Sequence, residues 1–259
     1  MKSHPIVSLC LPLTLSLTFG LPFGAPAAAE QALVAVAANF SEVMERLEAD
    51  FERETRHELT VTIGSTGKLY AQVHHGAPFD VLLAADQERP ERLESEGLAV
   101  AGSRFTYAVG RLTLWSPEQG RVGSDGRATL RAGDFRSLSL ANPALAPYGV
   151  AAKETLEQLG LWTTLETKLV MGENIGQAHA LVASGNAELG FVALSYVLSP
   201  RNQHPGSRWD VPERLYTPIR QDAVLLSRAA NNPAARAFLS FLQSEDVRKL
   251  IESYGYGSG

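Results

Sequence analysis

Apolar runs alternate with segments of helical spacing along the first hundred residues, which is the pattern of a parallel α/β sheet. The first apolar run covers 33–37, and apolar residues then recur every three or four positions over 40–51. The same unit repeats twice, with predicted strands at 59–63 and 79–84 and predicted helices at 69–73 and 88–96. Elements in this order predict a mostly parallel sheet flanked by helices.

The pattern changes after residue 100. Segments 104–109 and 112–115 are rich in β-forming residues and leave no room for a helix, so we expect them to cross from one lobe to another. Segment 200–214 is polar and Pro-rich, which predicts a loop. A second alternating set lies between them, with strands at 137–141, 168–171 and 189–193 and helices at 150–159 and 175–184.

The end of the chain is predicted to return to the first lobe. Residues 218–227 have the pattern of a strand, and two capped helices follow over 234–242 and 245–253. The chain of 259 residues is long enough for two modest α/β lobes. We therefore predict two lobes, each a mostly parallel sheet flanked by helices, with 30–110 and 218–259 in lobe 1 and 111–217 in lobe 2.

Strand-to-helix junctions in both halves carry the residues of helix N-caps. Asn39 and Asn174 are each followed three positions later by Glu or Gln, the spacing of a capping box, and Ser65 precedes the second helix. The first N–H groups of a helix lack helical partners, and each helix start carries roughly half a positive charge. Because ligands of such sheets sit beyond the strands' carboxyl ends, four helix starts facing one cleft could surround a small oxyanion.

The segment 62–69 invites comparison with a nucleotide-binding P-loop. That motif requires Gly at its first position and Ser or Thr directly after the Lys. Here Thr62 and Leu69 occupy those two places around Gly67 and Lys68. The spacing therefore excludes a P-loop and leaves either an anion site or an ordinary capped turn.

Residues 1–29 have the features of a cleavable export signal. Lys2 is followed by an apolar stretch over 6–23, and Ala27 to Ala29 offer a small-residue cleavage site near Ala29. A membrane anchor is the rival interpretation, but the prolines in the stretch and the cleavage site favour removal. Cys10, the single cysteine, would leave with the signal, which suits a periplasmic protein without disulfides.

Charge and histidine placement exclude two classes of partner. Loss of Lys2 with the signal changes the net charge from −5 to −6, and an acidic chain without a basic cluster is a poor nucleic-acid binder. His74 and His75 are adjacent and cannot share a helix face, so a metal site there is not expected. The other histidines of the mature body are expected at the surface, namely His57, His179 and His204.

In order and spacing, five stretches together resemble the type II periplasmic solute-binding proteins of ABC uptake systems, and among them the molybdate-binding proteins. The stretches are 36–40, 64–69, 79–86, 142–149 and 172–177. The resemblance covers essentially the whole mature chain. It implies a two-lobe α/β fold with the ligand in the interlobe cleft. It also implies a monomeric, non-enzymatic protein without a cofactor, which captures molybdate or tungstate and delivers it to membrane ABC permease subunits.

The same resemblance implies a set of ligand residues, with molybdenum present only as the bound oxyanion. These are Ala38, Asn39, Ser65 through hydroxyl and backbone, Tyr148, and the backbone of Ile175. The chain departs from the family pattern at two positions. Ser or Thr commonly stands where Ala38 is, and one branch has a ligating Tyr where Ala193 is. Asn39 and Tyr148 are expected to compensate for these two missing donors.

Two other functions stay open at this point. The cleft could hold another oxyanion such as sulfate, or the chain could be an exported hydrolase that uses Asp80, Asp86 or Ser65. No G-x-S-x-G nucleophile motif occurs. Donors on both lobes predict closure by a hinge, expected near 107–115 and 218–226.

Overall fold

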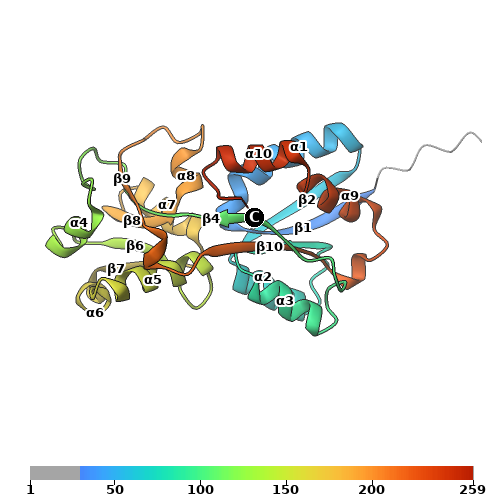
Figure 1. Ribbon diagram of the computed structural model, residues 1–259, viewed down its shortest axis with the longest axis horizontal. Coiled ribbons are helices and arrows are strands. Elements are labelled where there is room, and N and C mark those ends of the chain that lie inside the picture. Colours follow the sequence, from blue (N-terminus) through green and yellow to red (C-terminus); the bar gives the residue numbers. More distant parts are fainter. Residues whose placement is uncertain (1–29, 259) are drawn as a thin grey trace, which may run out of the picture.

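The computed structural model describes residues 30–258, so the predicted export signal over 1–29 lies outside the described residues. Within this range the chain forms two five-stranded sheets, β2-β1-β3-β10-β4 and β7-β6-β8-β5-β9. Each sheet has helices packed on it, and the two resulting lobes lie side by side (Figure 1). We call the lobe of the first sheet lobe 1 and the lobe of the second sheet lobe 2. The predicted α/β class with mostly parallel sheets is confirmed.

Lobe 1 is built from the beginning and the end of the chain. Its strands are β1 (Gln31–Ala37), β2 (Glu58–Gly64), β3 (Val81–Leu83), β4 (Phe105–Gly110) and β10 (Ile219–Leu225). Its helices are α1 (Ser41–Thr55), α2 (Thr66–His74), α3 (Glu88–Ser95), α9 (Pro233–Leu242) and α10 (Glu245–Ser253). Helices α1, α9 and α10 cover one face of the sheet and α2 and α3 the other, so a hydrophobic core lies on each face (Figure 1).

Lobe 2 is built from the middle of the chain. Its strands are β5 (Leu112–Ser116), β6 (Leu138–Ala141), β7 (Leu169–Gly172), β8 (Leu189–Ala193) and β9 (Ser207–Asp210). Its helices are α4 (Gly126–Ala132), α5 (Pro147–Gln158), α6 (Trp162–Leu165), α7 (Ile175–Ala183) and α8 (Leu194–Leu198). Short 3₁₀ turns complete the described elements, η1 (Ala38–Phe40), η2 (Glu166–Lys168), η3 (Glu213–Leu215) and η4 (Ser227–Ala229).

The chain changes lobe between β4 and β5 and between β9 and β10, and these four strands run antiparallel to the strands beside them. The remaining pairs of neighbouring strands are parallel. Strand β1 pairs in parallel with β2 and β3, whereas β10 enters between β3 and β4 and runs against both. In lobe 2, β6 pairs in parallel with β7 and β8, while β5 runs against β8 and β9. The chain crosses at Arg111, between β4 and β5, and returns between β9 and β10.

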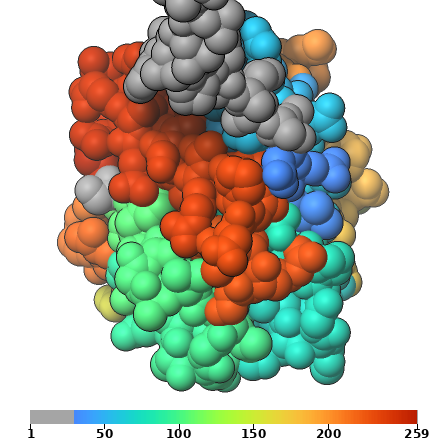
Figure 2. Space-filling view, turned by 90° about the vertical axis from the view of Figure 1, so that its right-hand side faces the viewer, coloured from blue at the N-terminus to red at the C-terminus, as the bar shows by residue number. Residues whose placement is uncertain are grey.

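The return of the chain brings distant segments together on lobe 1. Seen from the lobe 1 end, the red C-terminal part of the chain lies against the blue-to-green part that precedes residue 111 (Figure 2). An isolated bridge between Val109 and Gly257 ties the C-terminal tail to β4. Among the described residues, no helix has both the length and the apolar character that crossing a membrane requires.

Four short elements of lobe 2 were not predicted from the sequence, namely β9, α4, α6 and α8. Strand β9 lies inside the segment 200–214 that was predicted to be a loop, and this prediction is wrong. Its four residues carry one buried side chain, Trp209, which packs over Gly126 at the start of α4, itself unpredicted. Helix α8 directly continues β8 with only five residues, too few to show a helical period. Strand β9 and helix α4 depend on contacts with distant segments rather than on a local pattern.

Candidate functional site

Four helix or 3₁₀ starts meet around one small cavity between the lobes. From lobe 1 come the residues at the end of β1 and the start of α2, and from lobe 2 the starts of α5 and α7. The cavity is lined by Ala37, Ala38, Asn39, Gly64, Ser65, Thr66, Ala85, Ala146, Pro147, Tyr148, Asn174 and Ile175. All five site residues predicted from the sequence are among them.

Asn39 does not cap α1, which corrects the capping-box prediction. It lies in the 3₁₀ turn η1, and α1 begins at Ser41 without a side-chain cap. Its side chain is buried, and its Nδ2 donates to Gln221 Oε1 at 2.8 Å and to Tyr256 OH at 3.1 Å. Its neighbour Ala38 is equally buried and brings no side-chain donor to the cavity.

Ser65 and Thr66 begin α2 as expected, but they use their hydroxyls differently. Ser65 is the N-cap residue, yet its side chain makes no capping hydrogen bond, and its buried Oγ has no partner among the described residues. Thr66 Oγ1 accepts a hydrogen bond from Ala85 N at 3.0 Å, which orients it from the end of β3. Since the Thr66 oxygen already accepts a proton, its own proton can be donated toward the cavity.

Lobe 2 contributes Tyr148 and Ile175. Pro147 and Tyr148 open α5, and the Tyr148 ring is completely buried. Burial raises the pKa of the Tyr148 phenol well above its ordinary value, so the hydroxyl stays protonated and can donate. Ile175 is the first residue of α7, where a helical N–H has no helical partner. Asn174 caps this helix through Gln177 N at 2.9 Å, which confirms the predicted cap.

Two buried polar atoms on this cavity lack hydrogen-bond partners among the described residues, Ser65 Oγ and Asn39 Oδ1. A buried polar atom without a partner is costly, by about 1–3 kcal/mol, and therefore points to a ligand or another cause. The space itself is small, about 10 Å³ for the centre of a water molecule, which is roughly the room that one water needs. A four-oxygen anion is larger, so the walls must move apart to admit it.

The lining of the cavity carries no ionised side chain. Its residues are Ala, Gly, Pro, Ile, Asn, Ser, Thr and one protonated Tyr. What the lining offers are hydroxyl protons and the N–H groups of helix starts, whose dipoles favour negative charge. The arrangement therefore suits an anion with several oxygens and supplies no counter-charge.

Residues of lobe 2 also support the back of this site. Ser195 Oγ donates to the Asn39 carbonyl oxygen at 3.1 Å, and the Tyr196 hydroxyl donates to the Ala38 carbonyl oxygen. Burial raises the pKa of the Tyr196 phenol to about 12, so this donor is protonated at neutral pH. The two hydrogen bonds hold the 3₁₀ turn whose residues line the cavity.

His179 is half-buried, whereas the sequence analysis expected it at the surface. Its ring is stacked between Trp115 and Tyr196, with ring centroids 5.1 Å and 4.8 Å away. Its Nε2 is buried without a partner among the described residues, and burial lowers the pKa of the ring. His179 therefore serves as a packing aromatic behind Tyr196. No cluster of His, Cys, Asp and Glu within the described residues could hold a metal ion.

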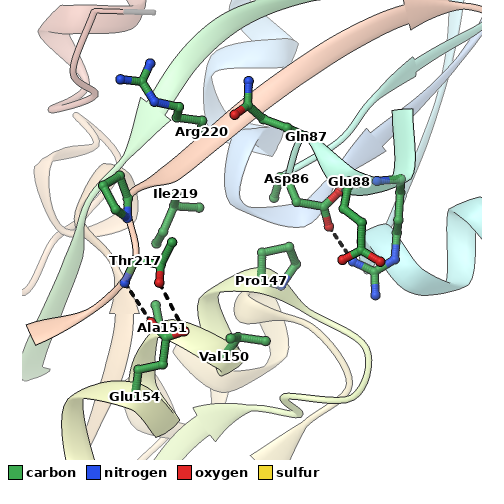
Figure 3. A pocket seen from close by; sticks show the side chains of 13 residues that line it. Asp86, Gln87, Glu88, Pro147, Val150, Ala151, Glu154, Thr217, Ile219 and Arg220 are labelled. Carbon is green, nitrogen blue, oxygen red and sulfur yellow. Dashed lines mark hydrogen bonds and ion pairs between the residues drawn. The ribbon is translucent and has the colours of Figure 1, made fainter. Parts of the chain in front are cut away.

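A larger pocket of about 350 Å³ opens beside the cavity, with residues of both lobes around it (Figure 3). Two of its three acidic groups, Asp86 and Glu154, are already engaged. Asp86 pairs with Arg89, and the Glu154 carboxylate accepts from Thr217 N at 2.6 Å. None of the buried polar atoms without a partner among the described residues belongs to this pocket, whereas two belong to the smaller cavity, so we assign the candidate site to the smaller one.

Comparisons with known proteins agree with this geometry. The family model of bacterial extracellular solute-binding proteins matches residues 32–257. The chain belongs to this family. The molybdate-binding protein ModA of Azotobacter vinelandii is 51% identical over 229 residues, which cover 88% of this chain and 90% of that relative. The ModA of Rhodobacter capsulatus is 47% identical, again over 88% of this chain, and over 89% of its own length.

A solved structure extends the comparison to the fold. The periplasmic molybdate-binding protein of Azotobacter vinelandii superposes with a TM-score of 0.85 at 38% sequence identity, and the match covers 88% of this chain and 99% of that one. Both lobes of this solute-binding protein are therefore shared with it. Family membership also confirms that the chain is a binding protein rather than an enzyme.

Three residues of the site were missed from the sequence. Thr66 lies in the segment 62–69, but the orientation of its hydroxyl depends on Ala85, 19 positions later. Gln221 and Tyr256 contact the Asn39 side chain from 182 and 217 positions away. A second hydroxyl residue directly after Ser65 was a sequence signal that could have pointed to Thr66. No local pattern marks Gln221 or Tyr256.

The two adjacent hydroxyls at the start of α2 should differ in their effect on folding. Thr66→Val leaves the buried Ala85 N–H without its acceptor and should lower the free energy of unfolding by about 1–3 kcal/mol. Ser65→Ala removes a buried oxygen that has no partner, so it should not lower the free energy of unfolding. Urea unfolding of both variants without added ligand measures the difference. Equal losses would show that Ser65 is engaged structurally as well.

Proposed function

We propose that this solute-binding protein captures molybdate in the cavity between its lobes and delivers it to an ABC permease. The observation that carries the proposal is the combination of two relatives named as molybdate-binding proteins, at 51% and 47% identity, with a cavity of neutral donors. Molybdate is a tetrahedral dianion at neutral pH and needs donors from several directions. Helix starts on both lobes supply them.

The proposed ligand set keeps the predicted residues and adds Thr66. Ser65 would donate through its hydroxyl and its backbone N–H, and Thr66 through the proton that Ala85 leaves free. Tyr148 and the Ile175 N–H would bind from lobe 2. The Thr66 hydroxyl provides a donor beside Ala38, where the family commonly has a hydroxyl residue. Ala193 does not line the cavity, and Tyr196, three residues later, instead supports the turn through a carbonyl.

Other functions find less support in the same contacts. For a hydrolase, Ser65 Oγ has no base within hydrogen-bond distance among the described residues, Asp80 is paired with Arg228, and Asp86 with Arg89. For sulfate, the charge and shape are the same but the bonds are shorter, so discrimination must come from the size of the closed cavity. Tungstate has nearly the size of molybdate, and we expect the site to accept both.

Transport requires export and a membrane partner. We propose that segment 1–29 directs the chain to the periplasm and is removed near Ala29, and that the mature chain acts as a monomer that docks on the permease subunits. The acidic mature chain does not need a positive surface for this task, because capture depends on the local dipoles of the cavity.

Closure of the lobes around the anion follows from the placement of the donors. Asn39, Ser65 and Thr66 belong to lobe 1, and Tyr148 and Ile175 to lobe 2. An anion that contacts both groups stabilises the closed state, because only that state offers it all the donors. We propose that the hinge lies in the two crossing segments, near Arg111 and between β9 and β10.

Molybdate and tungstate should raise the melting temperature far more than sulfate does. Binding to the folded state alone stabilises it by RT ln(1 + [L]/Kd), about 4 kcal/mol at a thousandfold excess over Kd. Thermal unfolding of the mature protein at equal concentrations of the three anions is the measurement. Equal shifts for all three would contradict selection by size.

Ser65→Ala should weaken molybdate binding while leaving folding nearly intact. A hydrogen bond from a hydroxyl to a charged acceptor contributes about 1.5–3 kcal/mol, so Kd should rise about tenfold or more. Calorimetric titration of the variant and the wild-type protein gives the ratio. An unchanged Kd would mean that Ser65 binds through its N–H alone.

Molybdate should make the protein more compact than the open, ligand-free state that admits the anion. Solution scattering should show a smaller radius of gyration after molybdate is added, because lobe 2 closes over the anion. Sulfate at a concentration that does not bind serves as the control and should leave the scattering unchanged. Identical profiles with and without bound molybdate would favour a rigid, preformed site.

A further inference from the structure

Gln221 lies at the centre of a buried chain of hydrogen bonds that joins the two lobes behind the cavity. Its Oε1 lies 2.8 Å from Asn39 Nδ2 and 3.1 Å from Tyr107 OH, and its Nε2 lies 3.4 Å from Tyr148 OH. Gln221 is itself fully buried and does not line the cavity. It therefore connects a residue of the lobe 1 wall with a residue of the lobe 2 wall without touching the ligand space.

Two features of the backbone account for the position of the Gln221 side chain. The pairing of β10 with β4 shifts between Gln221 and Asp222, an irregularity of the kind that re-aims side chains in a sheet. Gly110, at the lobe crossing, leaves the space that the chain needs. A Cβ on Gly110 would lie 2.6 Å from Gln221 Nε2 and 2.2 Å from Tyr148 OH. A glycine at this crossing thus makes room for both polar groups.

In the structure, the side-chain amide of Asn39 is oriented so that its oxygen, and not its NH₂ group, would face an anion in the cavity. Asn39 Nδ2 donates to Gln221 and Tyr256, neither of which lines the cavity, so the unpaired Oδ1 is the end on the cavity side. A carbonyl oxygen there would repel an oxyanion. The single Tyr107 proton also faces two acceptors in this arrangement, the Ala84 carbonyl oxygen at 3.0 Å and Gln221 Oε1 at 3.1 Å.

Turning both amides by 180° leaves the heavy-atom positions in place, gives Asn39 Oδ1 a partner and removes the second acceptor at Tyr107. It leaves one contact without a proton, because Tyr256 donates to the Asn39 carbonyl oxygen at 2.6 Å and not to Asn39 Oδ1. The hydrogen bond from the Asn39 NH₂ group to the anion offsets that contact. Gln221 then donates to Asn39 and to the Tyr107 oxygen, and Tyr107 donates to the Ala84 carbonyl alone. Asn39 presents its NH₂ group to the cavity. The long contact with Tyr148 is the weakest of the chain, so Tyr148 can exchange Gln221 for an anion oxygen without disturbing Asn39.

We propose that Gln221 is a positioning residue that decides which end of the Asn39 amide faces the oxyanion. When its Nε2 points to Asn39, the Asn39 oxygen is occupied and the Asn39 NH₂ group donates to the ligand. The inference rests on the proposed function, since it assumes a molybdate-type anion in the cavity. On this proposal, Gln221 contributes to specificity for fully deprotonated oxyanions without contacting the ligand, because it makes Asn39 a donor.

Two substitutions at Gln221 separate the possibilities. Gln221→Met keeps the length of the side chain but removes its polar atoms, so Asn39 loses its orientation, and molybdate affinity should fall about tenfold, the worth of one hydrogen bond to a charged group. Gln221→Glu offers only acceptors when ionised and holds the Asn39 NH₂ group away from the cavity, so its loss should be larger. Gln243→Met, the same exchange at the C-cap of α9, is the matched control and should bind like the wild type.

The decisive measurement repeats the titrations in an Asn39→Ala background. If Gln221 acts through Asn39, Gln221→Met should cause no further loss there. A second measurement follows the NMR signals of the Asn39 side-chain amide. These signals would not depend on Gln221 if Gln221 only stabilised the fold. In ¹⁵N-labelled protein, the Asn39 NH₂ signals should shift on adding molybdate to the wild type and stay nearly unchanged in Gln221→Met.

The outcomes distinguish this inference from the function on which it rests. If the wild-type protein does not bind molybdate, the proposed function and the inference both fail. If the wild type binds and Gln221→Met binds equally well, the inference alone is overturned. Equal losses with and without Asn39 also overturn it, because Gln221 would then act on the fold. Urea unfolding of each variant shows whether the protein measured is folded.

Discussion

For the proposed function the site must hold a charged ligand in a dry space without a counter-charge, and the rest of the structure depends on this constraint. An ion taken out of water is costly unless it is hydrogen-bonded or paired. The cavity lining supplies no Lys or Arg, so only fixed dipoles can compensate for the lost water. Strands that end at the same edge of a sheet bring helix starts together, and two such sheets facing each other surround the space.

Donors of this kind act only when they are held in place before binding, because ordering them later would reduce affinity. Several groups of this site are supported from behind. Ala85 orients Thr66, Ser195 and Tyr196 hold the carbonyls of the η1 turn, and Gln221 contacts Tyr148. Hydrogen bonds on the far side from the cavity therefore hold these residues in place before a ligand binds.

Sequence patterns predicted the regular part of this architecture, and the family resemblance supplied the five predicted positions that line the cavity. Period and cap residues are local signals, so the main strands and helices and the junctions at Ser65 and Ile175 could be located. Orientation could not be predicted, because it is set by contacts over long sequence distances. Asn39 has the spacing of a capping residue, yet its amide is bound by Gln221, 182 positions later. Strand β9 likewise depends on the packing of Trp209 against Gly126.

The contacts between the lobes differ in strength on the two sides of the site, and this difference suggests how it opens. On one side Gly67 N donates to Leu145 O at 2.9 Å, and Lys68 pairs with Glu173 at 2.6 Å. Both side chains of this ion pair are about half exposed, and such pairs contribute little. On the other side the bonds from α8 to η1 are buried, and α8 starts beside the crossing, with Leu194 N bonded to Arg111 O at 2.9 Å. The buried contacts lie near the pivot and can persist, whereas the exposed contacts can separate at low cost. We infer that the cleft opens on the side of α2 and α7.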